Sequence, residues 1–232
     1  MIIDITRCRY APGYMPKAAE GFFNPFFANA NVAFRREALE AVGGYDDRCQ
    51  TGEDVDVSIR LSRAGWELWY EPAAIIQHQE RYTFPHLLRQ WFGYGWGQPW
   101  LYKKHLGKPR LQFYVAGDPV KNPRPYGAKC VLDLPFFCYG LVFLSAYYLF
   151  HAALLGLIIG VIAHSPITCK IAGAAALASG LYYATIRFNW RRPLRSIGML
   201  GLRYAADTAF VAGALVAGVR HGVVLLGATR TR

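Results

Sequence analysis

Residues 51–60 read Thr-Gly-Glu-Asp-Val-Asp-Val-Ser-Ile-Arg (TGEDVDVSIR), a stretch that places three carboxylic acids within four positions. This concentration stands out because the 232-residue chain carries a formal net charge of +11. Thr51 and Asp54 have the spacing of a capping box, with Asp in place of the usual Glu or Gln. Apolar residues then recur at helical intervals. The stretch therefore predicts a helix that begins near Gly52 and is closed by Gly65.

The acids at the start of this helix have two explanations. Carboxylates in a first turn interact favourably with the helix dipole, by ~0.3–1 kcal/mol each, so a purely structural role is available. The other explanation is that one of them removes a proton from a substrate. The local stretch alone favours the structural role. Asp56 and Arg60 have i,i+4 spacing and are predicted to form a surface ion pair.

The segments on either side of this helix indicate a mixed α/β domain. A short helix is predicted from Arg36 to Val42, because Gly43 and Gly44 follow it as stop residues. A longer amphipathic helix is predicted over 84–97, where it runs into a glycine-rich turn. Alternating or β-rich runs predict short strands at 31–34, 66–70 and 73–78.

The second half of the chain is predicted to lie in a membrane. Charged residues make up 18% of the chain, against about a quarter in an average soluble domain. Apolar runs at 134–163 and 167–186 each reach the ~20 residues that cross a bilayer, and together they predict a helical hairpin. Basic residues gather at 103–129 and 187–195, beside these runs, which places the first 130 residues on the cytoplasmic side. Residues 196–227 predict a helix in the interface or packed on the hairpin, with a third crossing left open.

Other classes of protein fit the composition poorly. The Lys and Arg residues form no dense stripe, so a nucleic-acid partner is not expected. No signal peptide is visible, because Met1 to Tyr10 has no apolar core segment. No CxxC pair is present, which argues against a zinc cluster, and the cysteines are expected to be reduced thiols. The five cysteines are at positions 8, 49, 130, 138 and 169.

Three segments, taken in order, carry a family resemblance. They are ANVAFRREALEAVGGYDD (30–47), TGEDVDVSIRLSRAGWELWYEPAAIIQH (51–78) and LLRQWFGYGWG (87–97). Together they resemble the C-terminal half of the catalytic domain of membrane-associated family-2 inverting glycosyltransferases, which have a GT-A fold. The set is specific because the Gly-Gly-aromatic-Asp loop, the Glu-Asp pair, the Ala-Gly-Trp turn and the His after a strand keep the family's order.

The resemblance implies catalytic roles for the acidic pair. In the family the Asp of the Glu-Asp pair is the catalytic base, which corresponds to Asp54, with Glu53 as a supporting residue. A carboxylate there would take the proton of an acceptor hydroxyl as that oxygen attacks the sugar. A divalent metal (Mn²⁺ or Mg²⁺) usually offsets the charge of the leaving nucleoside diphosphate. His78 matches a position that in some members binds the metal or the diphosphate.

The resemblance also suggests substrate contacts at Asn31, Asp46, Gln90 and Trp91. Processive members carry a Gln-x-x-Arg-Trp motif near Gln90, and this chain does not reproduce it. The departure argues against a polymerase of the cellulose type and favours transfer of one or a few sugars. Turn, loop or membrane-interface roles remain open for the same four residues.

The resulting interpretation divides the chain into four parts. Residues 1–105 are expected to form the acceptor-side part of a GT-A domain, 106–133 a basic membrane-proximal linker, 134–187 a transmembrane helical hairpin, and 188–232 a basic loop with an apolar or interfacial helix. The fold class is α/β. The expected protein is a multi-pass cell-membrane enzyme of the hexosyltransferase type, whose catalytic part faces the cytoplasm.

The expected substrates are a nucleotide-sugar donor and a hydroxyl on a lipid-linked or cell-envelope polysaccharide acceptor. The family's N-terminal half, with its nucleotide-binding βαβ units and Asp-x-Asp metal motif, has no counterpart here. The sequence therefore predicts a truncated enzyme, inactive alone, or one whose donor-binding half comes from a separate chain. The alternative from another class is a non-catalytic membrane module that binds an acceptor or a partner.

Overall fold

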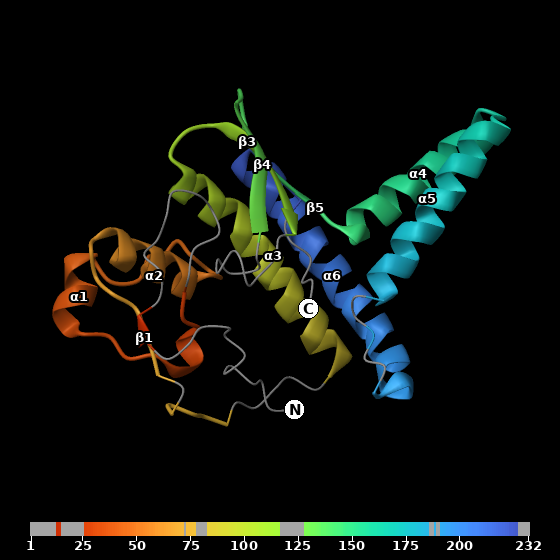
Figure 1. Ribbon diagram of the computed structural model, residues 1–232. Helices are drawn as coiled ribbons and strands as arrows, with labels where there is room; N and C mark the ends of the chain where they lie inside the picture. Colours follow the sequence, from red (N-terminus) through yellow and green to blue (C-terminus); the bar gives the residue numbers. More distant parts are fainter. Residues whose placement is uncertain are drawn as a thin grey trace.

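The computed structural model describes residues 13–14, 26–71, 73–77, 83–116, 128–185, 188 and 191–226. Figure 1 shows a mixed α/β body from which two packed helices project. The elements are β1 (Gly13–Tyr14), η2 (Asn29–Asn31), α1 (Arg36–Ala41), α2 (Glu53–Arg63), β2 (Trp69–Tyr70), α3 (Phe84–Leu106), β3 (Arg110–Ala116), β4 (Ala128–Pro135), β5 (Tyr139–Leu144), α4 (Ala146–Ile162), α5 (Pro166–Thr185), α6 (Pro193–His221) and β6 (Val223–Leu226).

The two short helices of the first half lie where the sequence predicts them. α1 is followed by Gly43 and Gly44, both with positive φ, and Gly65 follows α2 with φ 91°. The predicted capping box is wrong. The N-cap of α2 is Gly52, in a left-handed conformation with no side-chain capping bond, so Thr51 lies one residue too early to cap the helix.

The predicted strands of the first half are shorter than expected or absent. Only Trp69–Tyr70 of the 66–70 run forms a strand, which pairs antiparallel with Gly13–Tyr14. Residues 29–31 form a 3₁₀ turn, and residues 73–77 contain no strand.

A four-stranded sheet is built from segments that the sequence assigns to a linker and a hairpin. Its strand order is β4-β3-β5-β6, with β3 antiparallel to β4 and parallel to β5, and β5 parallel to β6. The sheet packs on α3 and α6 through a core that includes Tyr102, Phe143, Ala214 and Leu225. Within the segment predicted as a linker, residues 110–116 and 128–133 therefore belong to strands of this sheet.

The glycine-rich segment predicted as a turn is the middle of one continuous helix, α3. Its glycines allow α6 to approach closely along the crossing seen in Figure 1. A Cβ at Gly95 would overlap the carbonyl oxygen of Phe210 on α6, and a Cβ at Gly213 would overlap the carbonyl oxygen of Phe92 on α3. Small residues at a helix crossing let the two backbones come together, so tertiary packing outweighs the poor helix propensity of glycine.

We expect Gly95→Ala to destabilise the protein by about 2 kcal/mol or more, because the added methyl group has no space at this crossing. Thermal unfolding of the purified protein in detergent measures the loss. Gly201→Ala is the matched control, since no atom lies within 4 Å of a Cβ at that α6 position. There the change should be neutral or stabilising by up to about 1 kcal/mol. Equal losses in the two variants would contradict this account of the crossing.

The apolar run at 134–163 is not a single helix. Its first part supplies the end of β4 and the whole of β5, and helix begins only at Ala146. β-Branched and aromatic residues in YGLVFL suit a strand, and the parallel pairings with β3 and β6 place this strand inside the sheet. α4 and α5 then pack against each other as the projecting pair in Figure 1. The predicted hairpin of helices is thus shorter at its beginning than the sequence suggests.

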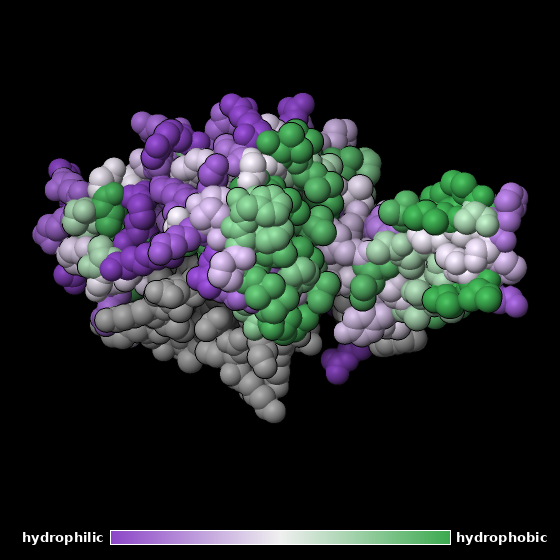
Figure 2. All heavy atoms as spheres, turned by 90° about the horizontal axis from the view of Figure 1, so that it is seen from above, coloured by the Kyte–Doolittle hydropathy of each residue, from purple (hydrophilic) through white to green (hydrophobic). Residues whose placement is uncertain are grey.

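The surfaces of α4 and α5 are strongly apolar, as the green side chains at the right of Figure 2 show. Exposed residues include Leu155, Ile162, Ile167 and Leu181, and α4 contains no charged residue. Among the described helices, α6 is the one long and apolar enough to cross a membrane, with 39% of its most apolar window buried inside the protein. α4 is a shorter apolar helix of 17 residues.

The C-terminal helix packs chiefly on α3 and less on the projecting pair. Its contact with α4 and α5 is a cluster in which the Tyr183 hydroxyl donates to Asp207, and the Tyr147 hydroxyl lies 3.0 Å from Thr208 Oγ1. α6 therefore connects the body to the base of the projecting pair. The helix predicted over 196–227 ends earlier, at His221, because Val223–Leu226 forms β6 beside β5.

Candidate functional site

Glu53 and Asp54, the acidic pair, lie at the start of α2. Two polar side chains and one backbone N–H group form hydrogen bonds around them. The Asn29 side-chain amide donates to Glu53 Oε1 at 3.1 Å, and the Tyr45 hydroxyl donates to Asn29 Oδ1 at 2.8 Å. The backbone N–H of Val55 donates to Asp54 Oδ1 at 2.8 Å. The 3₁₀ turn and the loop after Gly44 thus hold Glu53 in place, while Asp54 accepts a hydrogen bond within the first turn of its own helix.

The carboxylate of Asp54 has an environment that makes it a better base. Burial raises its pKa, and the charge of Glu53 raises it further. Hydrogen bonds from the backbone N–H groups of Val55 and Asn29 only partly offset this rise. Partial burial and the charges of Asp54 and Glu53 also raise the pKa of Tyr45, so its hydroxyl keeps the proton that it donates to Asn29. A raised carboxyl pKa suits proton abstraction from a hydroxyl near neutral pH.

The other residues singled out in the sequence lie in separate places. Asn31 donates through its side-chain amide to the carbonyl of Ala74 at 2.7 Å, which ties the 3₁₀ turn to the segment after β2. Gln90 donates to the Tyr94 hydroxyl within α3, and the Trp91 ring meets the Tyr94 ring edge-on at 5.7 Å.

Asp46 and His78 are the remaining predicted site residues, and the structure describes only the first of them. Asp46 is held by ion pairs to Arg48 and Lys104, at 2.8 and 2.7 Å, which lower its pKa well below the usual range. His78 lies outside the described residues.

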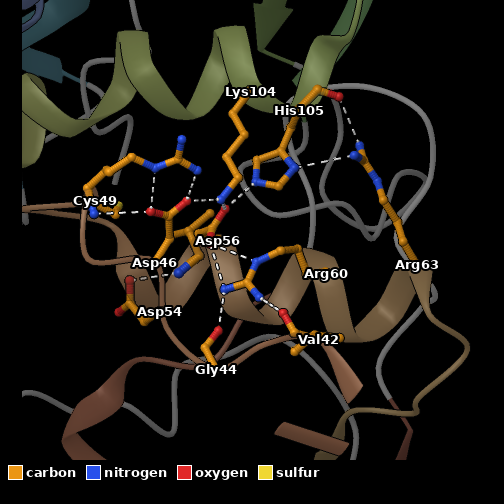
Figure 3. A network of polar contacts seen from close by, with 12 residues as sticks. Val42, Gly44, Asp46, Cys49, Asp54, Asp56, Arg60, Arg63, Lys104 and His105 are labelled. Carbon is orange, nitrogen blue, oxygen red and sulfur yellow. Dashed lines mark hydrogen bonds and ion pairs between the residues drawn. The ribbon is translucent and has the colours of Figure 1, made fainter. Parts of the chain in front are cut away.

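A buried ionic network centres on Asp56, two residues after Asp54 on α2, as Figure 3 shows. Asp56 is fully buried and contacts Arg60 Nε at 2.8 Å, Lys104 Nζ at 2.7 Å and His105 Nε2 at 2.8 Å. Arg60 also donates to the carbonyls of Val42 and Gly44. The Asp56–Arg60 pair predicted from the sequence exists, but it is a buried anchor of the Gly-Gly loop and not a surface pair.

Charge and hydrogen bonding keep Asp56 ionised. Burial raises its pKa, but the hydrogen bonds from His105, Lys104 and Arg60 outweigh that effect and lower the pKa to about 2. Arg63 Nη1 lies 3.3 Å from His105 Nδ1, and a guanidinium can only donate. His105 Nδ1 therefore accepts, and its Nε2 carries the hydrogen that points to Asp56.

Lys104 and His105 were not predicted as site residues, since they appear in the sequence only as part of a basic cluster. Lys104 bridges Asp46 and Asp56, so it joins the loop after Gly44, α2 and the end of α3. Helical spacing places His105 on the same side of α3 as the buried residues Leu101 and Tyr102. This spacing is the signal in the sequence that could have predicted a buried position for His105.

The described part of the chain contains no metal centre built from protein side chains alone. No group of three or more His, Cys, Asp and Glu side chains in that part is arranged to hold a metal ion. Glu53 and Asp54 alone would not form a complete protein cage, but Mg²⁺ is usually bound through one or two carboxylates together with substrate phosphates.

Comparison with known proteins places this site in a family. A family-level match to glycosyl transferase family group 2 extends over residues 18–187, well over half of the chain. The chain belongs to glycosyl transferase family group 2. The resemblance to family-2 glycosyltransferases is thereby confirmed, and the matched region includes the acidic pair, the ionic network and the projecting helices.

Three curated bacterial proteins each match part of the chain. The succinoglycan biosynthesis protein ExoA of Rhizobium meliloti is 36% identical over 82 residues, which cover 35% of this chain and 25% of that protein. The pre-mycofactocin glycosyltransferase of Mycobacterium tuberculosis is 39% identical over 66 residues, which cover 28% of this chain and 13% of that protein. The O-antigen chain rhamnosyltransferase WbaN of Salmonella anatum is 27% identical over 116 residues, which cover 45% and 37%.

The chain thus spans between 13% and 37% of the length of these curated relatives. No solved structure matches it at a significant level.

Proposed function

We propose that this glycosyltransferase transfers a sugar from a nucleotide-sugar to an acceptor hydroxyl with inversion of configuration, and that Asp54 is the base. The observation that carries the proposal is the environment of Asp54. It is a half-buried carboxylate with a raised pKa, at the start of a helix that a buried ionic network holds in place. The roles of Asp46, Gln90 and Trp91 in binding substrate, and a GT-A arrangement of the whole domain, are part of the same proposal.

The chemistry requires one displacement. The Asp54 carboxylate takes the proton of the acceptor hydroxyl while that oxygen forms a bond to the anomeric carbon of the donor sugar. The bond from the anomeric carbon to the phosphate oxygen breaks, and the electron pair leaves with the nucleoside diphosphate. Glu53, fixed by Asn29 and Tyr45, keeps a second negative charge close to Asp54 and so keeps its proton affinity high.

The acceptor is proposed to be lipid-linked or part of the cell envelope, and the apolar surface of the projecting pair supports this. A helix that is apolar on all sides and not covered by protein fits a lipid environment. Basic residues on both sides of α4 and α5 favour a cytoplasmic position for the acidic pair. A divalent cation with His78 as one ligand completes the proposal, and chelation of metal in the assay tests it.

The test is a transfer assay on the protein as its host makes it, with a nucleotide-sugar of known anomeric configuration. We expect consumption of the donor to depend on a membrane extract that supplies the acceptor, and the product linkage to have the opposite configuration by NMR. A product with retained configuration would contradict single displacement. Transfer to a soluble acceptor only, with none to lipid, would overturn the acceptor assignment. Failure to consume any donor would favour the non-catalytic binding module.

A further inference from the structure

A pocket lies where the loop before α2, the middle of α3 and the end of α6 meet. Its walls include Arg48 from the loop, Trp96 and Trp100 from α3, and Arg220 and His221 from α6. Thr51 also lines the pocket, two residues before the acidic pair, and Gly97 of α3 packs directly against its backbone. Neither the sequence nor the proposed reaction assigns a role to this pocket.

The described walls of the pocket are basic and aromatic and contain no carboxylate. The Arg220 guanidinium lies over the Trp96 ring at 5.8 Å, and Lys104 lies over the Trp100 ring at 4.6 Å. Lys103 donates to the carbonyl of His221 at 2.8 Å, which adds a further positive charge beside the pocket. Of these cationic groups, Lys104 is already ion-paired with Asp46 and Asp56, so the charge left for an anion comes chiefly from the arginine side of the pocket.

The two arginines differ in what occupies them. Arg48 is already engaged by the carboxylate of Asp46, through two hydrogen bonds at 2.9 and 2.8 Å. Arg220 has no ion pair with a carboxylate in the described part of the chain, and its contact is the face of Trp96. A cation–π contact at this distance does not occupy the N–H donors of the guanidinium, which can therefore meet a ligand. Arg220 is thus the group in this pocket prepared for an incoming anion.

We propose that this pocket binds a phosphate group of a ligand, with Arg220 as the principal contact and the tryptophan rings beside the group that carries the phosphate. A guanidinium can donate two parallel hydrogen bonds to the oxygens of a phosphate. No carboxylate in the described wall of the pocket competes with the phosphate for these donors. Thr51 and Gln50 add neutral polar groups to the wall.

A membrane lipid is the source of phosphate that the surroundings favour. Val216 lies one turn before Arg220 on α6 and is 52% exposed, and Val219 is 87% exposed, so these two valines, three residues apart, form an exposed apolar strip beside Arg220. A phosphate on a long prenyl or acyl chain would place its head on Arg220 and its chain along this strip. The identity of the ligand as an acceptor rests on the function proposed above, whereas phosphate binding itself does not.

Direct binding tests the proposal apart from any transfer activity. The probes are inorganic pyrophosphate, titrated into the protein in neutral detergent, and phosphatidylcholine vesicles that contain farnesyl phosphate. We expect Arg220→Gln to weaken binding of the phosphate-bearing probe about tenfold, which corresponds to about 1.4 kcal/mol. Arg220→Lys should restore part of the affinity. Arg195→Gln is the matched control, because it removes the same charge at the other end of the same helix.

The two probes distinguish the sources of phosphate. Arg220-dependent binding of the farnesyl phosphate vesicles alone assigns the pocket to a lipid head, and Arg220-dependent binding of pyrophosphate as well assigns it to phosphate groups in general. Equal losses in Arg220→Gln and Arg195→Gln would overturn the proposal, because they indicate attraction by overall charge. Unchanged binding in Arg220→Gln would overturn it too. If the protein consumes no donor but still binds the phosphate probes through Arg220, the proposed transfer reaction is wrong and the proposed phosphate site is supported.

Discussion

Replacement of Asp54 by Asn should lower the rate of sugar transfer about a thousandfold and leave the fold unchanged. An amide has nearly the shape of the carboxylate but cannot take a proton, and general-base catalysis contributes on the order of 10²–10⁴-fold. The Val55 N–H can still donate to the amide oxygen, so the start of α2 should persist. Turnover of the nucleotide-sugar in membranes that contain the variant measures the rate, and the unfolding temperature of the purified variant checks the fold.

Glu53→Gln is the matched comparison, because it removes the neighbouring charge and leaves the base in place. Since Glu53 contributes to the raised pKa of Asp54, its loss should move the acid limb of the transfer-rate profile to lower pH. In the wild type, Asp54 must be ionised to act, so the rate should fall as pH drops through its raised pKa. A thousandfold loss in Glu53→Gln together with a mild loss in Asp54→Asn would reverse the two assigned roles.

The local chemistry of the first half follows from sequence because it depends on near neighbours. Gly43 and Gly44 end α1, and the acidic pair opens α2, as their positions along the chain indicate. The family resemblance added a role for Asp54 that the stretch alone did not favour. Which of the three acids is buried could not be read from spacing, since Asp56 is covered by His105, 49 positions later in the chain.

Longer-range pairing explains where the sequence interpretation failed. An apolar run such as 134–163 satisfies the length criterion for a membrane helix, yet its first part joins β3 and β6, which are distant in sequence. The glycines of α3 predict a turn by propensity, but α6 packs against them and keeps the segment helical. In both cases the deciding partner lies in another segment of the chain, where periodicity in one window gives no information about it.

Replacement of Asp56 by Asn should destabilise the protein by about 3–5 kcal/mol, the largest loss of stability expected for any single charge here. Removal of one partner from a buried ionic network leaves the others uncompensated. Arg60 and Lys104 would keep their positive charges around a neutral side chain that is fully buried. Asn also places an N–H group where one carboxylate oxygen now accepts hydrogen bonds, so geometry as well as charge is lost.

Thermal unfolding in detergent measures this loss, and Asp133→Asn is its control. Asp133 pairs with Arg110 at 2.7 Å on the surface, with side-chain exposures of 32% and 41%, and also accepts a hydrogen bond from Gln112 at 2.9 Å. The oxygen of an Asn amide can still accept the bond from Gln112, so neutralisation should cost about 1 kcal/mol, the value of an exposed ion pair. Equal losses in the two variants would show that the Asp56 network does not hold α2 to α3.

The pH dependence of the free energy of unfolding is a second test of the Asp56 network. Because its folded-state pKa is lowered to about 2, the ionised Asp56 contributes stability above the ordinary aspartate pKa of about 3.9. That contribution is lost as pH falls through about 2. The stability difference between wild type and Asp56→Asn should therefore be largest near neutral pH and shrink between about pH 4 and pH 2. Since the network fixes the helix that carries Asp54, Asp56→Asn should also lower transfer at temperatures where the variant is still folded, although Asp56 itself touches no substrate.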